Sequence, residues 1–190
     1  MKHINRKNII IAVTAIVLLS VIVSGITIFN LIKTTPYEYL QNHFNKSESA
    51  VYPAQLLCQT NDESNENIII VFYANKNGGF NCAILEKTML SFKLLDSSGS
   101  LFFRDDKTQY KYGYYSGSYL CSWHDYDGER RALFWGINKD ESVEKLLVDG
   151  KESECTEING YNGIDFKIFW SFGYWEDMPD FQEIPAQAAK

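Results

Sequence analysis

The distribution of apolar and polar positions divides the chain near residue 33. Residues 9–32 are mostly apolar and contain no charged side chain, whereas every acidic residue of the protein lies beyond them. At about 1.5 Å per residue, a helix over this run would be roughly 36 Å long, enough to cross a hydrocarbon core of about 30 Å. The pattern therefore predicts a transmembrane helix over residues 9–32.

Flanking charge predicts the orientation of this helix. Lys2, Arg6 and Lys7 precede the run, and Lys33 follows it. Cationic flanks are retained in the cytoplasm, so the amino end is expected inside and the bulk of the chain outside. A cleaved secretory signal has an apolar run of about 7–15 residues and a small-x-small exit, and neither fits here. We therefore expect an uncleaved signal anchor, at the cell membrane and single-pass.

Beyond the anchor, a short helix is expected before the strands begin. Thr35 can cap a helix, Pro36 suits its first position, and Tyr37, Leu40 and Phe44 recur at helical spacing. The predicted organisation is a cytoplasmic N-terminus (1–8), the signal anchor (9–32), a juxtamembrane segment with a short helix (33–50) and an extracytoplasmic β domain (51–190).

Strand patterns dominate the rest of the chain. Two segments, 68–73 and 131–137, are apolar on both faces and indicate central strands. Turn sequences separate further expected strands at 55–59, 80–86, 90–95, 119–123, 143–148, 151–156 and 166–172, with turns at 158–163 and a loosely docked polar tail over 176–190. The fold class predicted is mainly β, an antiparallel β-sandwich-like domain.

One internal similarity bears on how that domain is built. Residues 72–77 and 134–140 each form an aromatic strand that breaks into a turn through Asn-Lys. A duplicated β unit would explain this, but chance similarity between two strand–turn units is the explanation we favour.

Composition and charge narrow the partners. The chain has twelve Phe, twelve Tyr and four Trp, which favours a packed β core over disorder. Of its eighteen Lys and Arg, four precede residue 34, so the remaining fourteen face twenty-four Asp and Glu. A domain this acidic repels nucleic acid, which we exclude as a partner, and no motif indicates a cofactor.

Four cysteines, Cys58, Cys82, Cys121 and Cys155, lie outside the apolar run, and none forms a CxxC pair. The spacing argues against a structural zinc site. In an exported domain an even count favours two disulfides. Pairing 58–82 with 121–155 is preferred because each closes a short loop, and unpaired buried thiols are the alternative.

Candidate chemistry is sparse. The cluster from His124 to Glu129 could offer carboxylates to calcium, but an Asp-Gly turn explains the same residues, and we favour the turn. Neither Ser122 nor Ser171 lies in a nucleophile elbow, so we do not expect an enzyme. An aromatic binding surface is the remaining candidate, although half-buried tyrosines on the outer face of a sheet are favoured over it; its residues are Tyr110, Tyr112, Tyr114, Tyr115 and Trp175.

Residues 132–151, a strand ending in aromatic-Gly, a polar turn and a Val/Lys-rich hairpin, resemble a segment of uncharacterised small membrane-anchored extracytoplasmic proteins of Gram-positive bacteria. The resemblance implies a cell-surface setting and no particular activity. The leading hypothesis is a binding or protein-interaction module at the cell envelope that contacts an envelope protein or glycan. The alternative is an extracytoplasmic hydrolase acting on envelope glycan or peptide.

Overall fold

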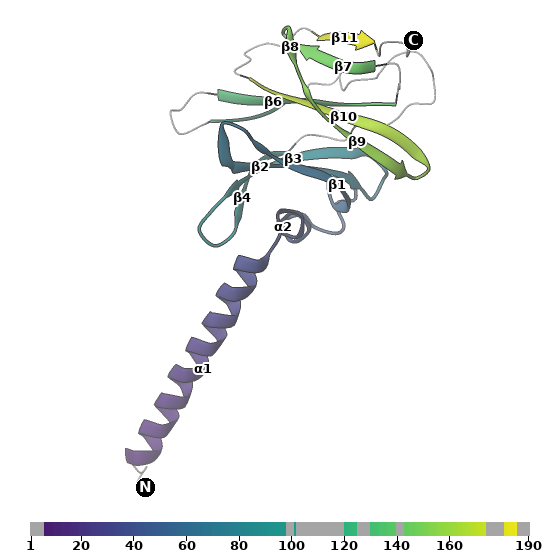
Figure 1. Cartoon of the computed structure of the whole chain (residues 1–190). Helices are drawn as coiled ribbons and strands as arrows, with labels where there is room; N and C mark the ends of the chain where they lie inside the picture. The colour runs from purple at the N-terminus through teal and green to yellow at the C-terminus, as the bar shows by residue number, and fades with distance from the viewer. Residues whose placement is uncertain are drawn as a thin grey trace.

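The chain is mainly β, as the sequence predicts, with two helices at its amino end (Figure 1). The computed structural model describes residues 6–97, 101, 120–124, 130–139, 143–173 and 181–185, with side chains for 13–28, 34–97, 101, 132–139 and 143–173. The helices are α1 (Arg6–Lys33) and α2 (Pro36–His43). The described strands are β1 (Pro53–Asp62), β2 (Asn65–Asn75), β3 (Phe80–Lys87), β4 (Phe92–Ser97), β5 (Leu120–His124), β6 (Arg130–Asn138), β7 (Val143–Val148), β8 (Lys151–Glu152), β9 (Glu154–Tyr161), β10 (Ile164–Gly173) and β11 (Phe181–Pro185).

The apolar run forms α1, a single helix of 28 residues that extends away from the strands (Figure 1). Its described apolar side chains are exposed, from 45% at Ile28 to 68% at Ile16. Two hydroxyls bond within the helix, since Ser20 Oγ donates to the Val17 carbonyl at 2.7 Å and Thr27 Oγ1 to that of Val23 at 2.9 Å. Over the described residues, no helix is found that is both long and apolar enough to span a membrane.

Helix α2 begins where the sequence predicts it. Thr35 is the N-cap: its hydroxyl accepts a hydrogen bond from the Glu38 amide, and the Glu38 carboxylate accepts one from the Thr35 amide. Pro36 occupies the start of the first turn, where its missing N–H has no cost. Because only Thr34 and Thr35 separate the two helices, α2 holds the strands close to the end of α1.

The strands form three antiparallel sheets. Sheet A is a meander in the order β1-β2-β3-β4. Sheet B has the order β5-β6-β10-β9, in which β10 returns beside β6 rather than following the chain order. Sheet C is smaller, in the order β11-β7-β8. The chain therefore leaves sheet B after β6 to form β7 and β8 of sheet C and returns to complete sheet B with β9 and β10. β11 then completes sheet C.

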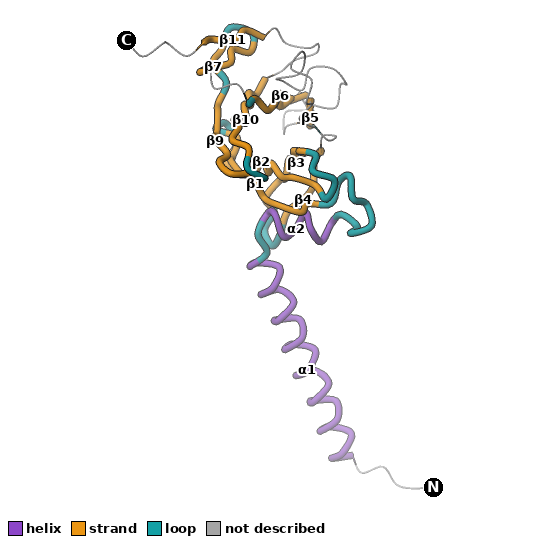
Figure 2. The backbone as a smooth tube through the Cα atoms, turned by 90° about the vertical axis from the view of Figure 1, so that its right-hand side faces the viewer, coloured by secondary structure: helices purple, strands orange, loops and turns teal. Residues whose placement is uncertain are grey.

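Three apolar clusters stack these elements in the order α2, sheet A, sheet B and sheet C (Figure 2). Strand β2 belongs to two of them, because its successive side chains point to opposite faces. Ile69, Val71 and Tyr73 pack with Leu40 of α2, whereas Phe72 and its even-numbered neighbours pack between sheets A and B. Both faces of β2 are thus buried, which confirms the prediction of a central strand.

Strand β6 divides its side chains in the same way. Leu133, Trp135 and Ile137 join the cluster shared with sheet A, and Phe134 joins the cluster shared with sheet C. The predicted split of this strand between two faces is confirmed. In β10, Phe166, Ile168, Trp170 and Phe172 share one face and pack in the cluster shared with sheet A.

Local turn geometry corrects three strand boundaries. β4 starts at Phe92 rather than residue 90, because the Thr88 amide donates to the Ser91 carbonyl and closes a turn over 88–91. The predicted return strand over 151–156 is instead split: β8 ends at Glu152, and β9 starts at Glu154. β9 then runs to Tyr161, so the next turn is Asn162-Gly163, both with positive φ, not residues 158–163.

Two further predictions are wrong. Part of the tail expected to dock loosely is β11, which pairs with β7 from Phe181 to Pro185. The disulfides are not formed at Cys58, Cys82 or Cys155. Cys58 on β1 and Cys82 on β3 are both register partners of Phe72 on β2. Their backbones are therefore two strand spacings apart, roughly 9.5 Å, which is too far for a disulfide.

The second predicted pair, 121–155, is separated further. Cys121 pairs with Leu133 of β6, and Cys155 pairs with Phe169 of β10. Since β6 and β10 both lie between β5 and β9, three strand spacings separate the two backbones. The short sequence separation of Cys121 and Cys155 therefore does not bring them together in the sheet.

Candidate functional site

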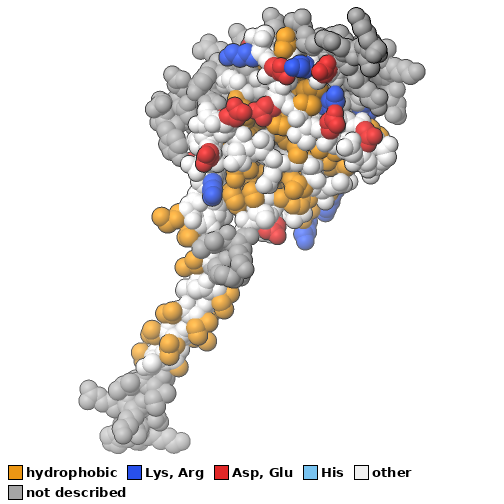
Figure 3. Space-filling view, viewed as in Figure 1, with side chains coloured by type: hydrophobic (Ala, Val, Ile, Leu, Met, Phe, Trp, Pro, Cys, Tyr) orange, Lys and Arg blue, Asp and Glu red, His pale blue; other side chains and the backbone are white. Residues whose placement is uncertain are grey.

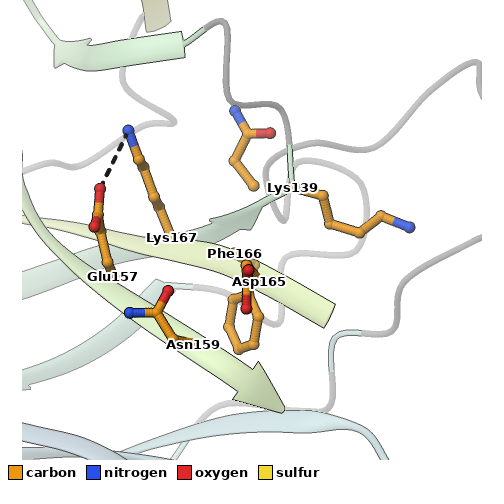
Figure 4. Close-up of a pocket in the computed structure, with 7 residues that line it drawn as sticks. Lys139, Glu157, Asn159, Asp165, Phe166 and Lys167 are labelled. Atoms are coloured by element: carbon orange, nitrogen blue, oxygen red, sulfur yellow. Dashed lines mark ion pairs between the residues drawn. The ribbon is translucent and has the colours of Figure 1, made fainter. Parts of the chain in front are cut away.

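A polar cleft of about 310 Å³ lies on sheet B where β6 ends and the β9–β10 hairpin turns (Figure 4). The end of β6 contributes Asn138 and the adjoining Lys139. Alternate residues of the hairpin contribute the rest of the polar lining, and one ring, that of Phe166, completes it; these residues are Glu157, Asn159, Asp165, Phe166 and Lys167. Its volume is at the lower end of the range for small-molecule sites, about 300–1,000 Å³.

Strand register sets the floor of this cleft. Lys167 of β10 is the direct partner of Glu157 on β9 and of Asn138 on β6. Cross-strand partners share one face of a sheet, so the three side chains form a row across three neighbouring strands. The row lies on the face of sheet B that sheet C partly covers, because Phe169 on the same face of β10 belongs to the cluster with β7.

Lys167 is the central charge of the row. Its ammonium lies 3.8 Å from Glu157 Oε1 and donates a hydrogen bond of 3.3 Å to the carbonyl of Val143, the first residue of β7. Its side chain is 23% exposed, whereas that of Glu157 is 66% exposed. The lysine therefore joins sheet B to sheet C while leaving the glutamate open to solvent.

The other charged residues of the cleft are placed differently. Asp165 Oδ1 accepts a hydrogen bond of 2.7 Å from the Gly160 amide and so braces the hairpin end. Lys139 extends away from the Glu157–Lys167 pair (Figure 4). With two carboxylates and two ammonium groups, the lining has no net charge, and its amides and charges offer both donors and acceptors.

The lining lacks the side chains of a serine- or cysteine-based catalytic centre. None of the seven is Ser, Cys or His, so the cleft holds no side chain of the kind that acyl transfer uses with a histidine base. The arrangement can bind polar groups through hydrogen bonds and single charges.

A second polar group lies where the β1–β2 hairpin approaches β9. Asp62 is buried, and its carboxylate accepts hydrogen bonds from the Ser64 amide at 2.9 Å and hydroxyl at 2.8 Å. Burial raises the pKa of Glu154, and the charges of Glu63 and Asp62 raise it further. The indole N–H of Trp170 partly offsets this rise in the pKa of Glu154, although it makes no hydrogen bond to the carboxylate.

This acidic group is not a metal centre. Throughout the described part of the chain, no set of three His, Cys, Asp or Glu side chains is arranged to hold a metal ion. The Asp62 carboxylate is hydrogen-bonded within the hairpin turn, and Glu154 is partly shielded from water.

Most residues singled out from the sequence lie outside the described residues. This holds for Tyr110, Tyr112, Tyr114, Tyr115 and Trp175, and for residues 125–129 of the expected turn or calcium site. The backbones of Cys121 and His124 are in β5. The aromatic surface thus stays a prediction.

The remaining cysteines are not activated. Burial raises the pKa of Cys58 to about 12, so this thiol stays protonated at neutral pH. Burial also raises the pKa of Cys155, although its side chain is exposed on β9 and the charge of Lys167 works in the opposite direction. Cys82 is fully buried in the cluster between the sheets.

Sequence reasoning missed the cleft for an identifiable reason. Glu157 and Asn159 alternate on one side of the Asn162-Gly163 turn, and Asp165 and Lys167 alternate on the other, which is the signature of a polar hairpin face. The predicted strands, 151–156 and 166–172, leave Glu157, Asn159 and Asp165 outside any strand, so this alternation is not recognised. Asn138 carried no local signal at all, because it arrives through the non-local pairing of β6 with β10.

Comparison with protein-family models, curated proteins and solved structures finds no match for this chain.

Proposed function

We propose that this chain is a single-pass membrane protein whose β domain, an antiparallel sandwich, stands on the extracytoplasmic face and binds an envelope partner through the cleft on sheet B. The observation that carries the binding role is the row of Glu157, Lys167 and Asn138 across three strands of a polar cleft. The partner is a polar segment of an envelope protein or glycan.

The anchor is supported by α1 and its sequence. A helix of 28 residues is about 42 Å long, more than a hydrocarbon core of about 30 Å requires. Its central 24 residues carry no charge, and the cations Lys2, Arg6 and Lys7 stand at the end expected in the cytoplasm. The resemblance of residues 132–151 to membrane-anchored proteins of Gram-positive bacteria agrees with this setting.

The sandwich is supported by ring contacts between the two larger sheets. Phe72 of β2 lies 5.5 Å from the ring centroids of both Trp135 on β6 and Trp170 on β10. Phe80 of β3 lies 5.1 Å from Phe166 of β10. Such distances are those of packed aromatic pairs, so the two sheets contribute to one core.

The extracytoplasmic position has a direct test. Cys155 is an exposed thiol, whereas Cys58 and Cys82 are shielded. A membrane-impermeant maleimide should label Cys155 in intact cells of the wild-type chain and fail to label a Cys155→Ser variant at that site. Labelling that appears only after the cells are permeabilised would place the domain on the cytoplasmic side and contradict the proposal.

Binding is tested with the cleft intact and altered. Lys167→Met removes the central charge of the row, and Lys145→Met removes an ion-paired lysine of β7 outside the cleft. Crosslinking and pulldown from native membranes should recover a partner with wild type and Lys145→Met, with about tenfold less for Lys167→Met, as for a modest hot spot.

Isolated cell-wall glycan provides the second arm of the experiment, because a glycan partner would sediment the chain without any crosslinked protein. Equal recovery of a partner by wild type, Lys167→Met and Lys145→Met would contradict the role of the cleft. Absence of any reproducible partner in both arms would contradict the binding function.

A further inference from the structure

Exposed apolar side chains outside α1 are confined to one side of the domain. Among the described residues beyond α1, the large apolar side chains exposed to solvent are Leu56, Met89 and Leu90, at 39%, 95% and 40%. Leu56 is the register partner of Tyr73, whose side chain faces α2, so Leu56 shares that face. Met89 and Leu90 form the end of the β3–β4 hairpin, which extends from sheet A on the side of α1 (Figure 1).

Hydrogen bonds within the turn hold Met89 and Leu90 at the end of the hairpin. The Thr88 amide donates to the Ser91 carbonyl at 2.9 Å, and the Ser91 amide donates to Thr88 Oγ1 at 3.1 Å. These bonds close the turn beneath Met89 and Leu90 and leave both side chains at its apex. Exposure of nearly the whole Met89 side chain to water is unfavourable, and the geometry of the turn does not require it.

Aromatic packing fixes this apex relative to α2, which follows α1 after two residues. The Tyr39 ring of α2 lies 5.9 Å from the ring of Phe92, the first residue of β4, in an edge-on contact. Phe92 and Leu94 pack with Leu40 in the cluster between α2 and sheet A. The apex is therefore held against α2.

Charge around the apex suits a lipid surface. Lys87 is exposed at the end of β3, and the side chain of Lys93 on β4 is 66% exposed while lying 3.7 Å from Glu86. Basic side chains beside an apolar tip match phosphate groups above an acyl layer. In Figure 3, apolar side chains gather along α1 and on the nearest part of the domain, whereas most described acidic side chains lie further away.

We propose that Met89 and Leu90 insert into the headgroup–acyl boundary of the bilayer that α1 crosses, with Lys87 and Lys93 at the level of the phosphates. The domain then has two attachments to one membrane, α1 and the β3–β4 apex, and its orientation above the surface is fixed. This inference rests on the proposed anchor, and its test separates the two.

The test uses the full chain in vesicles of phosphatidylcholine with a fraction of phosphatidylglycerol. An environment-sensitive fluorophore is attached at Met89→Cys in a Cys121→Ser, Cys155→Ser background, with Lys151→Cys, exposed on β8 far from α1, as the matched control. Position 89 should show a blue-shifted emission and strong quenching by headgroup-level nitroxide lipids. Position 151 should show neither. Leu90→Asp should reduce the shift at position 89.

Alkaline carbonate extraction of the same vesicles distinguishes the failures. A chain that resists extraction but shows no shift at position 89 would overturn the lipid contact and leave the anchor in place. A chain that is extracted would overturn the anchor itself. A shift that depends on the protein-to-lipid ratio, with crosslinks between two copies at position 89, would assign the apex to a second copy and overturn the lipid contact.

Discussion

Phe72 lies at the centre of the contact between sheets A and B. Its ring is 1% exposed and touches two tryptophans, one from each central strand of sheet B. Each neighbour of Phe72 in β2 points to the opposite face and packs under α2. Phe72 is therefore a major contact between the two sheets, and the residues on the other face of β2 cannot replace it.

Replacing Phe72 with alanine should lower the free energy of unfolding by about 3–5 kcal/mol, through lost burial and the cavity that remains. Guanidinium unfolding in detergent micelles, followed by tryptophan fluorescence, measures the change. Met89→Ala is the matched control, because a side chain that is 95% exposed should change the stability by less than about 0.5 kcal/mol. Equal effects of the two substitutions would contradict the described core.

Glu154 gives the stability a pH dependence whose sign can be stated. Its pKa in the folded chain is raised above the ordinary value of 4.5, chiefly by burial, so the folded state holds the proton more tightly than the unfolded state. The stability that the protonated carboxyl contributes is complete below pH 4.5 and is lost as the pH rises through the raised pKa. Wild type should therefore lose stability relative to Glu154→Gln between about pH 4 and neutrality.

Unfolding curves at several pH values test this difference. Glu144→Gln, which removes one exposed carboxylate from β7, controls for the change in net charge. A gap between wild type and Glu154→Gln that is constant from acid to neutral pH would show that the carboxyl has no raised pKa.

At the scale of elements, α2 joins the anchor to the domain. Leu40 is fully buried and is the residue of α2 that packs beneath Val71 and Tyr73. Leu40→Ala should lower the free energy of unfolding by about 2–5 kcal/mol and make the segment 44–52 more sensitive to limited proteolysis. Asn42→Ala, at an exposed position of the same helix, should leave both unchanged. Resistance of Leu40→Ala to the protease would contradict the packing of α2 on sheet A.

The elements that the sequence predicts well are those with local signals. The N-cap Thr35, with Pro36 after it, fixes the start of α2, and Asp149-Gly150, with φ of 50° and 75°, joins β7 to β8. Both depend on backbone geometry that a few neighbouring residues impose. β11 lacks such a signal, because its pairing partner β7 lies more than thirty residues earlier in the chain.

The candidate cleft was beyond sequence reasoning for the same reason. Two of its three component strands are neighbours in the chain, but the third, β6, joins them only after the excursion through sheet C. The order β5-β6-β10-β9 also bears on the similarity between residues 72–77 and 134–140. Strand β2 turns directly into its partner β3, whereas the chain after β6 departs to sheet C, so the two similar segments begin different topologies.

At the scale of the whole molecule, the short connection between α1 and α2 should decide how the domain meets the membrane. Inserting ten Gly and Ser residues between Thr34 and Thr35 adds a flexible segment with an average span of about 18 Å. The domain would keep its fold but would no longer be held at the surface. The fluorophore at position 89 should then lose most of its blue shift, although the chain still resists alkaline extraction.

The same ten residues inserted between Gly150 and Lys151 provide the control. That turn lies in sheet C, at the end of the domain away from α1, and lengthening it should leave the fluorescence at position 89 unchanged (Figure 1). If the shift survives the insertion beside Thr35, the β3–β4 apex binds lipid by its own affinity, and the short connection is not what orients the domain. If both insertions abolish the shift, the apex depends on the integrity of the whole domain instead.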